Sequence, residues 1–341
     1  MWHALDIFIK LYNIFIRIKS LLELKTKYSL NFLLLNKVRY ISQKFSSDLD
    51  PNFITGFTDA EGSFMIFVSK SSENRIGWSV GARFEISLHI RDEDLLNRIR
   101  TYFNGAGNIT KFGEKKITFR VNDLEQITNI IIPHFQNYPL ITKKRVDFKL
   151  FSNVVKLLSN KEHLTIDGLD KIVAIRASMN LGLSESLKAS FPLIMPVPKP
   201  DFNLNKNFHP QWIAGFTSGE GYFGVKILSS STIKSGKQVK LIFQLTQHSR
   251  DEILMKNLVD YFGCGKYYTS RKRGDFQVIK LSEIIEIIIP FFQNNCIKGE
   301  KFKDFKDWCI VANLMKNKKH LSEEGLKYIQ DIVKSMNKGR Y

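Results

Sequence analysis

The sequence predicts an α+β fold of two pseudo-symmetric domains, each with the element order αββαββα. Three observations predict this class. The chain has 341 residues, more than one typical domain, and its 43% hydrophobic and 25% charged residues are typical of a globular protein with a substantial core. A long segment of the sequence occurs twice. Within each copy, the spacing of apolar residues changes from helical to strictly alternating and back again.

The duplication is visible in several paired segments. Residues 53–62 (FITGFTDAEG) return as residues 212–221 (WIAGFTSGEG), and residues 89–93 (HIRDE) return as residues 248–252 (HSRDE). Because the order is kept with only short gaps, we expect two copies of one domain that pair about a pseudo-two-fold axis. Further matches pair residues 130–133 with 287–290, Lys144, Asp147 and Phe148 with Lys301, Asp304 and Phe305, residues 160–164 with 317–321, and residues 178–180 with 335–337.

The domain boundaries follow from this duplication. We place the first domain at residues 49–187 and the second at residues 208–339. Residues 188–207 form the linker, because the prolines between Phe191 and Asn207 disfavour regular structure and stiffen a connector.

Residues 1–48 differ from the rest of the chain. They mix apolar runs with Lys and Arg and carry only Asp6, Glu23 and Asp48 as acids. Basic residues interrupt this segment before an apolar run of about 18 residues builds up, so we expect no membrane span. Two interpretations stay open, a mitochondrial targeting segment and a translated upstream sequence with no role in the fold.

Each copy begins with a helix. Asp50 and His209 each supply a side chain that can cap the helix, and each precedes a proline, which is favoured at the first helical position. Gly62 and Gly221 are expected to end these helices.

Strictly alternating strands follow each of these helices. Their apolar face forms the core, through Phe64, Ile66 and Val68 in the first copy and through the corresponding residues of the second. We expect a four-stranded antiparallel sheet in each copy, backed by helices and with its other face free for a ligand. The remaining elements of the first copy are a helix through Leu95, Leu96, Ile99 and Phe103, a strand pair ending near Phe119 and Val121, and helices between about 123 and 180.

The two repeated helices carry a stripe of very small residues. Gly56 and Ala60 lie four positions apart, as do Gly215 and Gly219, so each pair shares one helix face. The alternative is ordinary packing of small residues against a sheet. Because the stripe occurs in both copies, we expect the two helices to pack on each other at the domain interface.

Glu61 and Glu220 end these two helices. The helix dipole disfavours an anion at that end by roughly 0.3–1 kcal/mol, so a carboxylate placed there twice requires an explanation. The alternative to a functional role is that each glutamate only forms hydrogen bonds with neighbouring backbone at the helix end. If the helices pack side by side, the two carboxylates come close together and need a shared proton or cations, and oxygen ligands suit Mg²⁺. Such a metal pair suits phosphodiester hydrolysis. Ser218 replaces Asp59 in the second copy, so we assign Asp59 no catalytic role.

The charge of the chain points to a polyanionic partner. Lys and Arg outnumber Asp and Glu by 51 to 33, a formal net charge of +18. Nucleic acid is the leading candidate, and the alternatives are charge that serves solubility or binding to an anionic membrane surface. The three cysteines are far apart in the sequence and indicate neither a zinc site nor a disulfide framework.

Residues 54–62 (ITGFTDAEG) and 213–221 (IAGFTSGEG) resemble the two motifs of a single-chain LAGLIDADG homing endonuclease. The resemblance runs from about residue 48 to the C-terminus and is especially close to fungal mitochondrial, intron-encoded members. These share the His-x-x-Asp segments at His89 and His248, the Lys-x-x-Asp-Phe segments and the Asn-Lys-x-His-Leu segments. Neither motif ends in the Asp of the family name, but Glu serves as well as a metal ligand.

The resemblance implies a monomer in which two sheets form a saddle over the DNA major groove. It implies cleavage of both strands of a long double-stranded target with Mg²⁺ (or Mn²⁺), short 3′ overhangs, a role in intron mobility and a mitochondrial location. Glu61 and Glu220 would hold the metals, with help from the backbone oxygens of Ala60 and Gly219. His89, His248, His163 and His320 are expected to be structural.

The residues expected to contact DNA are those on the outward faces of the strands. Arg83 is the best candidate for a guanine contact, and Gln238 and Gln244 for adenine contacts, although any of these residues can instead touch only phosphate or water. In the first copy the set is Ser63, Met65, Phe67, Ser69, Ser79, Gly81, Arg83, Glu85, Ser87, Asn108, Thr110, Lys116, Thr118 and Arg120. In the second copy it is Tyr222, Gly224, Lys226, Leu228, Gln238, Lys240, Ile242, Gln244, Thr246, Lys266, Tyr268, Ser270 and Gln277.

Two other functions compete with the endonuclease. Some members of the family bind the intron RNA that encodes them and assist its splicing as maturases. A regulator could bind DNA through the same saddle without metals. Both carboxylates are retained in this sequence, which favours the enzyme.

Overall fold

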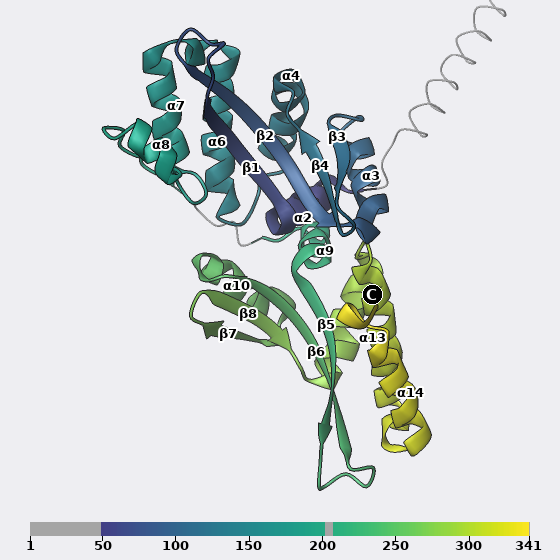
Figure 1. Ribbon diagram of the computed structural model, residues 1–341. Coiled ribbons are helices and arrows are strands. Elements are labelled where there is room, and N and C mark those ends of the chain that lie inside the picture. The colour runs from purple at the N-terminus through teal and green to yellow at the C-terminus, as the bar shows by residue number, and fades with distance from the viewer. Residues whose placement is uncertain (1–48, 202–206, 341) are drawn as a thin grey trace, which may run out of the picture. The chain divides into compact units, whose positions relative to one another are not determined.

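The computed structural model describes residues 49–201 and 207–340, and its first repeat has the predicted element order (Figure 1). The proposed extension, residues 1–48, lies outside the described residues. The four strands form one antiparallel sheet in the order β1-β2-β4-β3. Its elements are α2 (Pro51–Glu61), β1 (Gly62–Lys70), β2 (Trp78–His89), α3 (Glu93–Tyr102), β3 (Asn108–Phe112), β4 (Lys116–Val121), α4 (Leu124–Gln126), α5 (Ile132–Asn137), α6 (Lys144–Ser159), α7 (Ile166–Ser178) and α8 (Glu185–Ser190).

The second repeat builds the same sheet, in the order β5-β6-β8-β7. The predicted α+β class and the pseudo-symmetric αββαββα pattern are therefore confirmed, with several helices in the last position of the pattern. The elements are α9 (Pro210–Glu220), β5 (Gly221–Ser229), β6 (Lys237–His248), α10 (Glu252–Phe262), β7 (Lys266–Ser270), β8 (Arg273–Val278), α11 (Leu281–Glu283), α12 (Ile289–Asn294), α13 (Lys301–Lys316) and α14 (Glu323–Lys334).

Helices α2 and α9 begin and end at the predicted residues, but the glycines that end them do so for a different reason from the one expected. The side chains of Asp50 and His209 accept the backbone N–H of the residue two positions later, and a proline begins each helix. Gly62 and Gly221 end the helices in extended backbone, with φ of −80° and −71°, and not in the left-handed turn that a helix-ending glycine commonly adopts. A Cβ on Gly62 would lie 2.5 Å from Cγ2 of Thr58, so the glycine is needed for space where the chain turns directly into β1.

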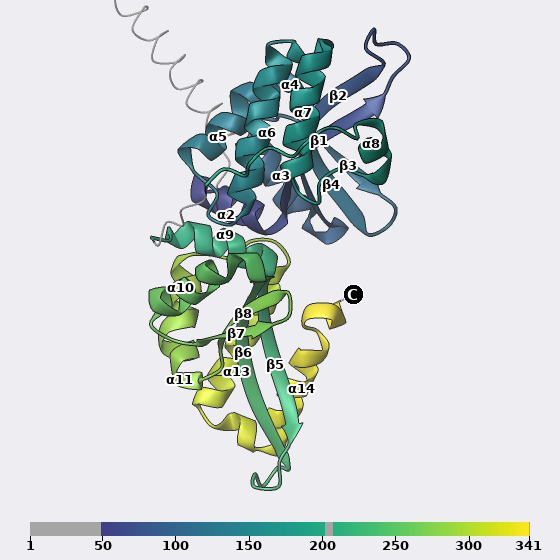
Figure 2. The same ribbon diagram turned by 90° about the vertical axis from the view of Figure 1, so that its left-hand side faces the viewer.

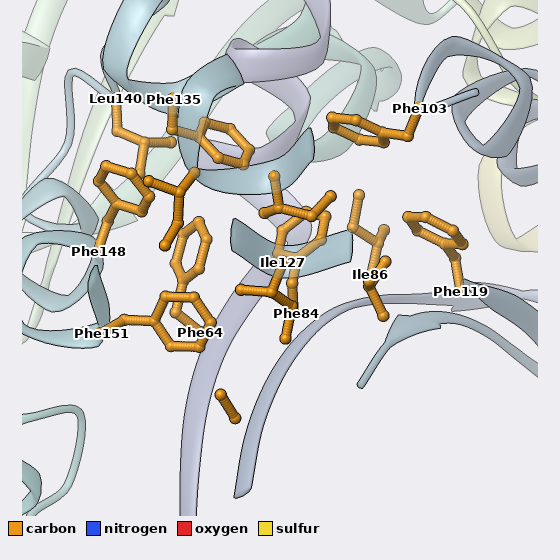
Figure 3. Packing of buried hydrophobic residues seen from close by; sticks show 14 of the residues in the cluster. Phe64, Phe84, Ile86, Phe103, Phe119, Ile127, Phe135, Leu140, Phe148 and Phe151 are labelled. Atoms are coloured by element: carbon orange, nitrogen blue, oxygen red, sulfur yellow. The ribbon is translucent and has the colours of Figure 1, made fainter. Parts of the chain in front are cut away.

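Each repeat has a core of its own between the inner face of the sheet and the helices. In the first repeat, the ring of Phe64 lies with its centroid 5.2 Å from those of Phe84 and Phe148 (Figure 3). Phe223 occupies the matching place in the second repeat, 5.4 Å from Phe243. Because such side chains are large and fully buried, they supply much of the hydrophobic free energy that holds the helices on the sheet.

The two repeats meet through α2 and α9, which lie against each other in both views (Figures 1 and 2). A Cβ added to Gly56 would overlap the carbonyl oxygen of Trp212, and one added to Gly215 would overlap that of Phe53. The predicted packing of the two helices, backbone against backbone, is confirmed. This contact brings the ends of α2 and α9, and therefore Glu61 and Glu220, to one place.

The segment between the repeats departs from the predicted linker at its first residues. Helix α8 runs from Glu185 to Ser190 and therefore crosses the proposed boundary at residue 188. Ser184 caps this helix with its side chain, a local signal that outweighs the prolines further along. No helix among residues 49–201 and 207–340 is long and apolar enough to cross a membrane.

Candidate active site and nucleic-acid interface

The carboxylates of Glu61 and Glu220 share one half-buried site at the ends of α2 and α9. A Cβ on Gly219 would lie 3.0 Å from Cγ of Glu61, so the glycine leaves room for this side chain to cross from one repeat to the other. Burial raises the pKa of Glu220 to about 7, and the negative charge of Glu61 adds to that rise. Burial likewise raises the pKa of Glu61. Two like charges in a poorly solvated site favour a bound cation.

Two lysines complete this site. The Nζ atom of Lys144 donates hydrogen bonds to the carbonyl oxygens of Thr58 and Asp59, at 2.8 and 3.0 Å. The Nζ atom of Lys301 donates to the carbonyl oxygen of Gly219. Each ammonium group thus lies at the negative end of a helix dipole and close to the two carboxylates. Burial lowers the pKa of both lysines. Asp59 opposes that effect most strongly at Lys144, and Glu61 and Glu220 oppose it at both lysines.

The roles of these lysines were not predicted. The sequence pairs Lys144 with Lys301 across the duplication, but both lie far along the chain from the glutamates. Only the fold brings the start of α6 to the end of α2 and the start of α13 to the end of α9. The carbonyl oxygens of Ala60 and Gly219 were expected to assist metal binding. Instead, that of Ala60 lies 3.5 Å from Nζ of Lys144, and that of Gly219 accepts the hydrogen bond from Nζ of Lys301.

Asp59 is structural. Its buried carboxylate accepts hydrogen bonds from the backbone N–H of Ile141 at 2.8 Å and from Nε1 of Trp212, in the other repeat, at 2.8 Å. The hydroxyl of Thr142 donates a further bond. In the second repeat, the hydroxyl of Ser218 accepts the backbone N–H of Lys298 at 3.0 Å. The Asp–Trp pair of one side is therefore replaced by a Ser–Phe pair on the other, since Phe53 corresponds to Trp212.

This asymmetric pair predicts a measurable coupling in stability. Asp59→Ser leaves the indole N–H of Trp212 without its buried acceptor, and a buried unsatisfied donor costs about 1–3 kcal/mol. Adding Trp212→Phe removes the orphaned donor and reproduces the pair found in the opposite repeat. In urea unfolding, we expect the double variant to recover about 1 kcal/mol or more relative to the sum of the two single variants. Strict additivity would show that the Asp59–Trp212 bond carries no net stability.

The predicted DNA-contacting residues lie on the face of each sheet opposite its core, as the strand registers require. Several are already held by neighbours. The guanidinium of Arg83 lies 4.3 Å above the ring of Phe67, and its Nε donates to Asn122 at 2.7 Å. Nε of Arg120 bonds to Glu85 at 2.9 Å. Such bonds hold long side chains in position and lower the entropy lost when they bind a ligand.

In the second repeat a chain of polar contacts replaces the charged one. Nε2 of Gln277 donates to Gln244 at 2.8 Å, and Nε2 of Gln244 donates to the hydroxyl of Thr246 at 2.9 Å. That hydroxyl donates to Asp275 at 2.7 Å. Asn122 and Asp275 were not among the predicted contact residues. Asp275 lies on the outward face of β8, two positions before Gln277, and Asn122 follows β4 two positions after Arg120, so both continue the outward alternation.

Three residues predicted to contact DNA are too buried to do so. Thr118 has no exposed surface, and its hydroxyl is hydrogen-bonded to that of Ser87 at 2.9 Å. Gly224 lies beneath the ring of Tyr222, and the side chain of Ile242 is buried. Alternation places all three on the outward face correctly, but it cannot predict which outward positions their neighbours cover. The expected contact of these three residues with DNA does not fit their burial.

The histidines of the repeated His-x-x-Asp segments have the expected structural role. Nδ1 of His89 accepts the backbone N–H of Arg91, and Nδ1 of His248 accepts that of Arg250 at 3.1 Å. Each bond caps a short 3₁₀ turn at the end of a long strand.

Fold and site together define a two-repeat protein in which one interface holds one carboxylate and one lysine from each half. A family model described as LAGLIDADG endonuclease matches residues 54–155 and again residues 213–312. These matches cover more than half of the chain, which therefore belongs to the LAGLIDADG endonuclease family. The predicted resemblance is confirmed.

Curated relatives and solved structures agree with this assignment. The chain is 42% identical over 301 residues to "Probable intron-encoded endonuclease 2" of Neurospora crassa, covering 84% of this chain and 65% of that protein. It is 38% identical over 301 residues to "Probable intron-encoded endonuclease 3" of the same organism, covering 87% of this chain and 56% of that protein. The chain thus spans less than two thirds of the length of these relatives.

Three of the similar solved structures hold DNA. The I-SmaMI LAGLIDADG homing endonuclease bound to cleaved DNA matches with a TM-score of 0.85 and 45% identity, covering 86% of this chain and 99% of that one. The I-LtrWI LAGLIDADG homing endonuclease bound to target DNA matches with a TM-score of 0.83 and 42% identity, covering 85% and 98%. A further I-SmaMI structure holds an uncleaved DNA target in the presence of calcium ions, with a TM-score of 0.84 and 45% identity, covering 86% and 100%.

Proposed function

We propose that this chain is a site-specific homing endonuclease that hydrolyses both strands of a long double-stranded DNA target. The observation that carries the proposal is the pair of half-buried carboxylates, Glu61 and Glu220, delivered by two helices that pack backbone against backbone. The similar proteins support it, because their names describe intron-encoded endonucleases and their structures hold cleaved or target DNA. One chain already supplies both carboxylates, so we expect it to act as a monomer.

The donor set at this site suits Mg²⁺ or Mn²⁺. Among residues 49–201 and 207–340, no cluster of three or more His, Cys, Asp or Glu side chains could hold a metal alone. Mg²⁺ does not need such a cluster, because it keeps several waters and is held by one or two carboxylates together with substrate phosphates. Glu61 and Glu220 would hold it. When bound, the metal would lower the pKa of an attacking water and stabilise the attacking and leaving oxygens.

The remaining residues of the site prepare it for a phosphate. The Nζ atoms of Lys144 and Lys301 lie beside the carboxylates in a buried site, where electrostatic interactions are stronger than in water. They would stabilise the charge that develops on the scissile phosphate. Because the two halves carry the same set, each is suited to one strand of the duplex.

The outward faces of the two sheets would bind the DNA on either side of the cut. Arg83 is our candidate for a guanine contact, and Gln238 and Gln244 for adenine contacts. The charged pairs of the first repeat and the amide chain of the second differ, so the two half-sites of the target should differ in sequence. Exposed lysines on the strands would add contacts to phosphate.

We also propose a mitochondrial role in the mobility of an intron. The curated relatives include an "Uncharacterized 50.9 kDa protein in ND4 intron 1" of Podospora anserina, which is 50% identical over 121 residues, covering 35% of this chain and 26% of that protein. Splicing assistance through intron RNA is the weaker alternative, because the names of the relatives describe endonucleases and the solved structures hold DNA.

The test of this proposal is cleavage in vitro. The substrate is a plasmid that carries the two exons joined across the insertion site of the intron that contains this reading frame, and the control plasmid keeps the intron. We expect one double-strand cut in the joined-exon plasmid with Mg²⁺ and none with EDTA. Binding of the intron RNA without cutting of either plasmid would overturn the endonuclease in favour of the splicing role.

A further inference from the structure

Two hydrogen bonds, one in each direction, link the repeats at the starts of the helices that carry the active-site lysines. Oδ1 of Asp92, in the first repeat, accepts the backbone N–H of Glu300 at 2.8 Å in the second repeat. Oδ1 of Asp251, in the second repeat, accepts the backbone N–H of Lys143 at 2.7 Å in the first. Glu300 and Lys143 are the N-cap residues of α13 and α6, and neither caps its helix with its own side chain. The capping anion therefore comes from the opposite half.

Each of these bonds lies one residue before a lysine of the site. Lys301 is the first residue of α13, and Lys144 is the first residue of α6. The flexible stem of a lysine does not fix its ammonium group by itself. Each ammonium group bonds to carbonyl oxygens at the end of α2 or α9, so the start of α6 or α13 must be held near that end. The carboxylates of Asp92 and Asp251 hold that backbone from across the interface, and the helix dipole adds to the attraction.

The local geometry is tight on both sides. Asp251 is 4% exposed. At Asp92, a Cβ on Gly299 would lie 2.6 Å from Oδ1, and Gly299 has a φ of +73° that favours glycine. Asp92 also lines one cavity together with Glu61 and Lys301. These aspartates are the last residues of the 3₁₀ turns that His89 and His248 cap, which gives the repeated His-x-x-Asp segment a physical purpose.

We propose that Asp92 and Asp251 are positioning residues, each of which fixes the active-site lysine of the opposite repeat. Asp92 holds Lys301 on the carbonyl oxygen of Gly219, and Asp251 holds Lys144 on the carbonyl oxygens at the end of α2. Neither lysine is then in place unless both repeats are docked, so the chain cannot assemble one half of the site alone. This inference rests on the proposed nuclease function.

The experiment measures the cutting rate of each strand separately, on the joined-exon plasmid with a different label on each strand. We expect Asp92→Ala to slow mainly the strand that Lys301→Ala slows, by about 10- to 100-fold, because a small misplacement of a catalytic group has effects of this size. Asp251→Ala should slow the other strand, together with Lys144→Ala. Asp92→Asn keeps an acceptor oxygen and should recover most of the lost rate.

Double variants separate positioning from a general loss of stability. We expect Asp92→Ala to have no further effect in the Lys301→Ala background and its full effect in the Lys144→Ala background. The control is Asp123→Ala, which also removes an aspartate cap, but one within its own repeat, where Asp123 at the start of α4 accepts the N–H of Gln126 at 2.8 Å. This control should lower the melting temperature without changing either strand's rate.

A second variant keeps the test decisive if Asp92→Ala does not fold. Glu300→Pro removes the donor and keeps Asp92, and Glu300 has a φ of −63°, which proline adopts. It should slow the same strand as Lys301→Ala. The inference is overturned if Asp92→Ala and Glu300→Pro leave the cutting rates of both strands unchanged. It is also overturned if either change lowers the rate of the Lys301→Ala protein by the same factor as the rate of the wild type. A wild-type protein that cuts neither strand would overturn the nuclease proposal itself.

Discussion

Replacing either Glu61 or Glu220 by Gln is expected to lower double-strand cutting by at least about 1,000-fold, since loss of a metal-holding carboxylate removes roughly 4 kcal/mol of transition-state stabilisation. Gln keeps the shape of the side chain but loses the charge that holds the cation. The one other acid on α2, Asp59, is buried and already bonded to Ile141 and Trp212, and α9 carries no acid besides Glu220, so no neighbouring acid on either helix is available to take over. Rates are measured in Mg²⁺ on the joined-exon plasmid.

DNA binding by these variants should be retained. The glutamates lie at the helix ends, while the proposed contact residues lie along the strands. Removal of a buried like charge should also leave the fold at least as stable as in the wild type. Affinity is measured with a labelled duplex without metal, and stability by thermal unfolding. Undiminished cutting by either variant would contradict the assignment of the metal ligands, whatever the binding result.

Replacing Gly215 by Ala is expected to lower the free energy of unfolding by about 3 kcal/mol or more, because a core that is already closely packed cannot accept the added methyl group without strain. The new Cβ would overlap the carbonyl oxygen of Phe53 and lie 2.8 Å from the backbone nitrogen of Phe57. Both are backbone atoms of α2 and cannot rotate away, so the two helices must separate. Gly56→Ala should have the same effect from the opposite side.

The matched control is Gly81→Ala. An added Cβ at Gly81 meets no atom within 4 Å, so we expect its stability to change by no more than about 0.5 kcal/mol. Stability is measured by urea unfolding of all three variants. A Gly215→Ala protein as stable as the wild type would show that α2 and α9 do not pack as closely as described.

The fold could be predicted from the sequence because its signals are local and occur twice. The caps at Asp50 and His209, the alternation along β1 and the spacing of Leu95 and Ile99 each act within a few residues. The duplication then shows that both copies share one fold. The small residues Gly56 and Gly215 predicted the contact of α2 with α9, because a stripe that occurs in both copies favours packing of the two helices on each other over ordinary packing against a sheet.

The candidate site was predictable only where it lies on those repeated helices. Glu61 and Glu220 stand out by their position at the unfavourable end of a helix dipole. Lys144 and Lys301 do not, because only tertiary structure brings their ammonium groups to the ends of α2 and α9. The bond from Trp212 to Asp59 crosses between repeats and breaks their symmetry, so no repeat comparison could reveal it.

The burial of outward residues has a similar cause. Alternation shows which face of a strand a side chain takes, but the neighbours on adjacent strands decide whether it is exposed. Thr118 is covered in this way, although Arg120, two positions further along the same strand, is partly exposed.

The central claim is that one interface between the repeats holds both carboxylates and serves both DNA strands. The most direct test is to sequence the ends of the product that the wild-type protein forms from the joined-exon plasmid in Mg²⁺. We expect one cut in each strand, at a single locus, with short 3′ overhangs. Cuts confined to one strand, or cuts scattered over many loci, would contradict it.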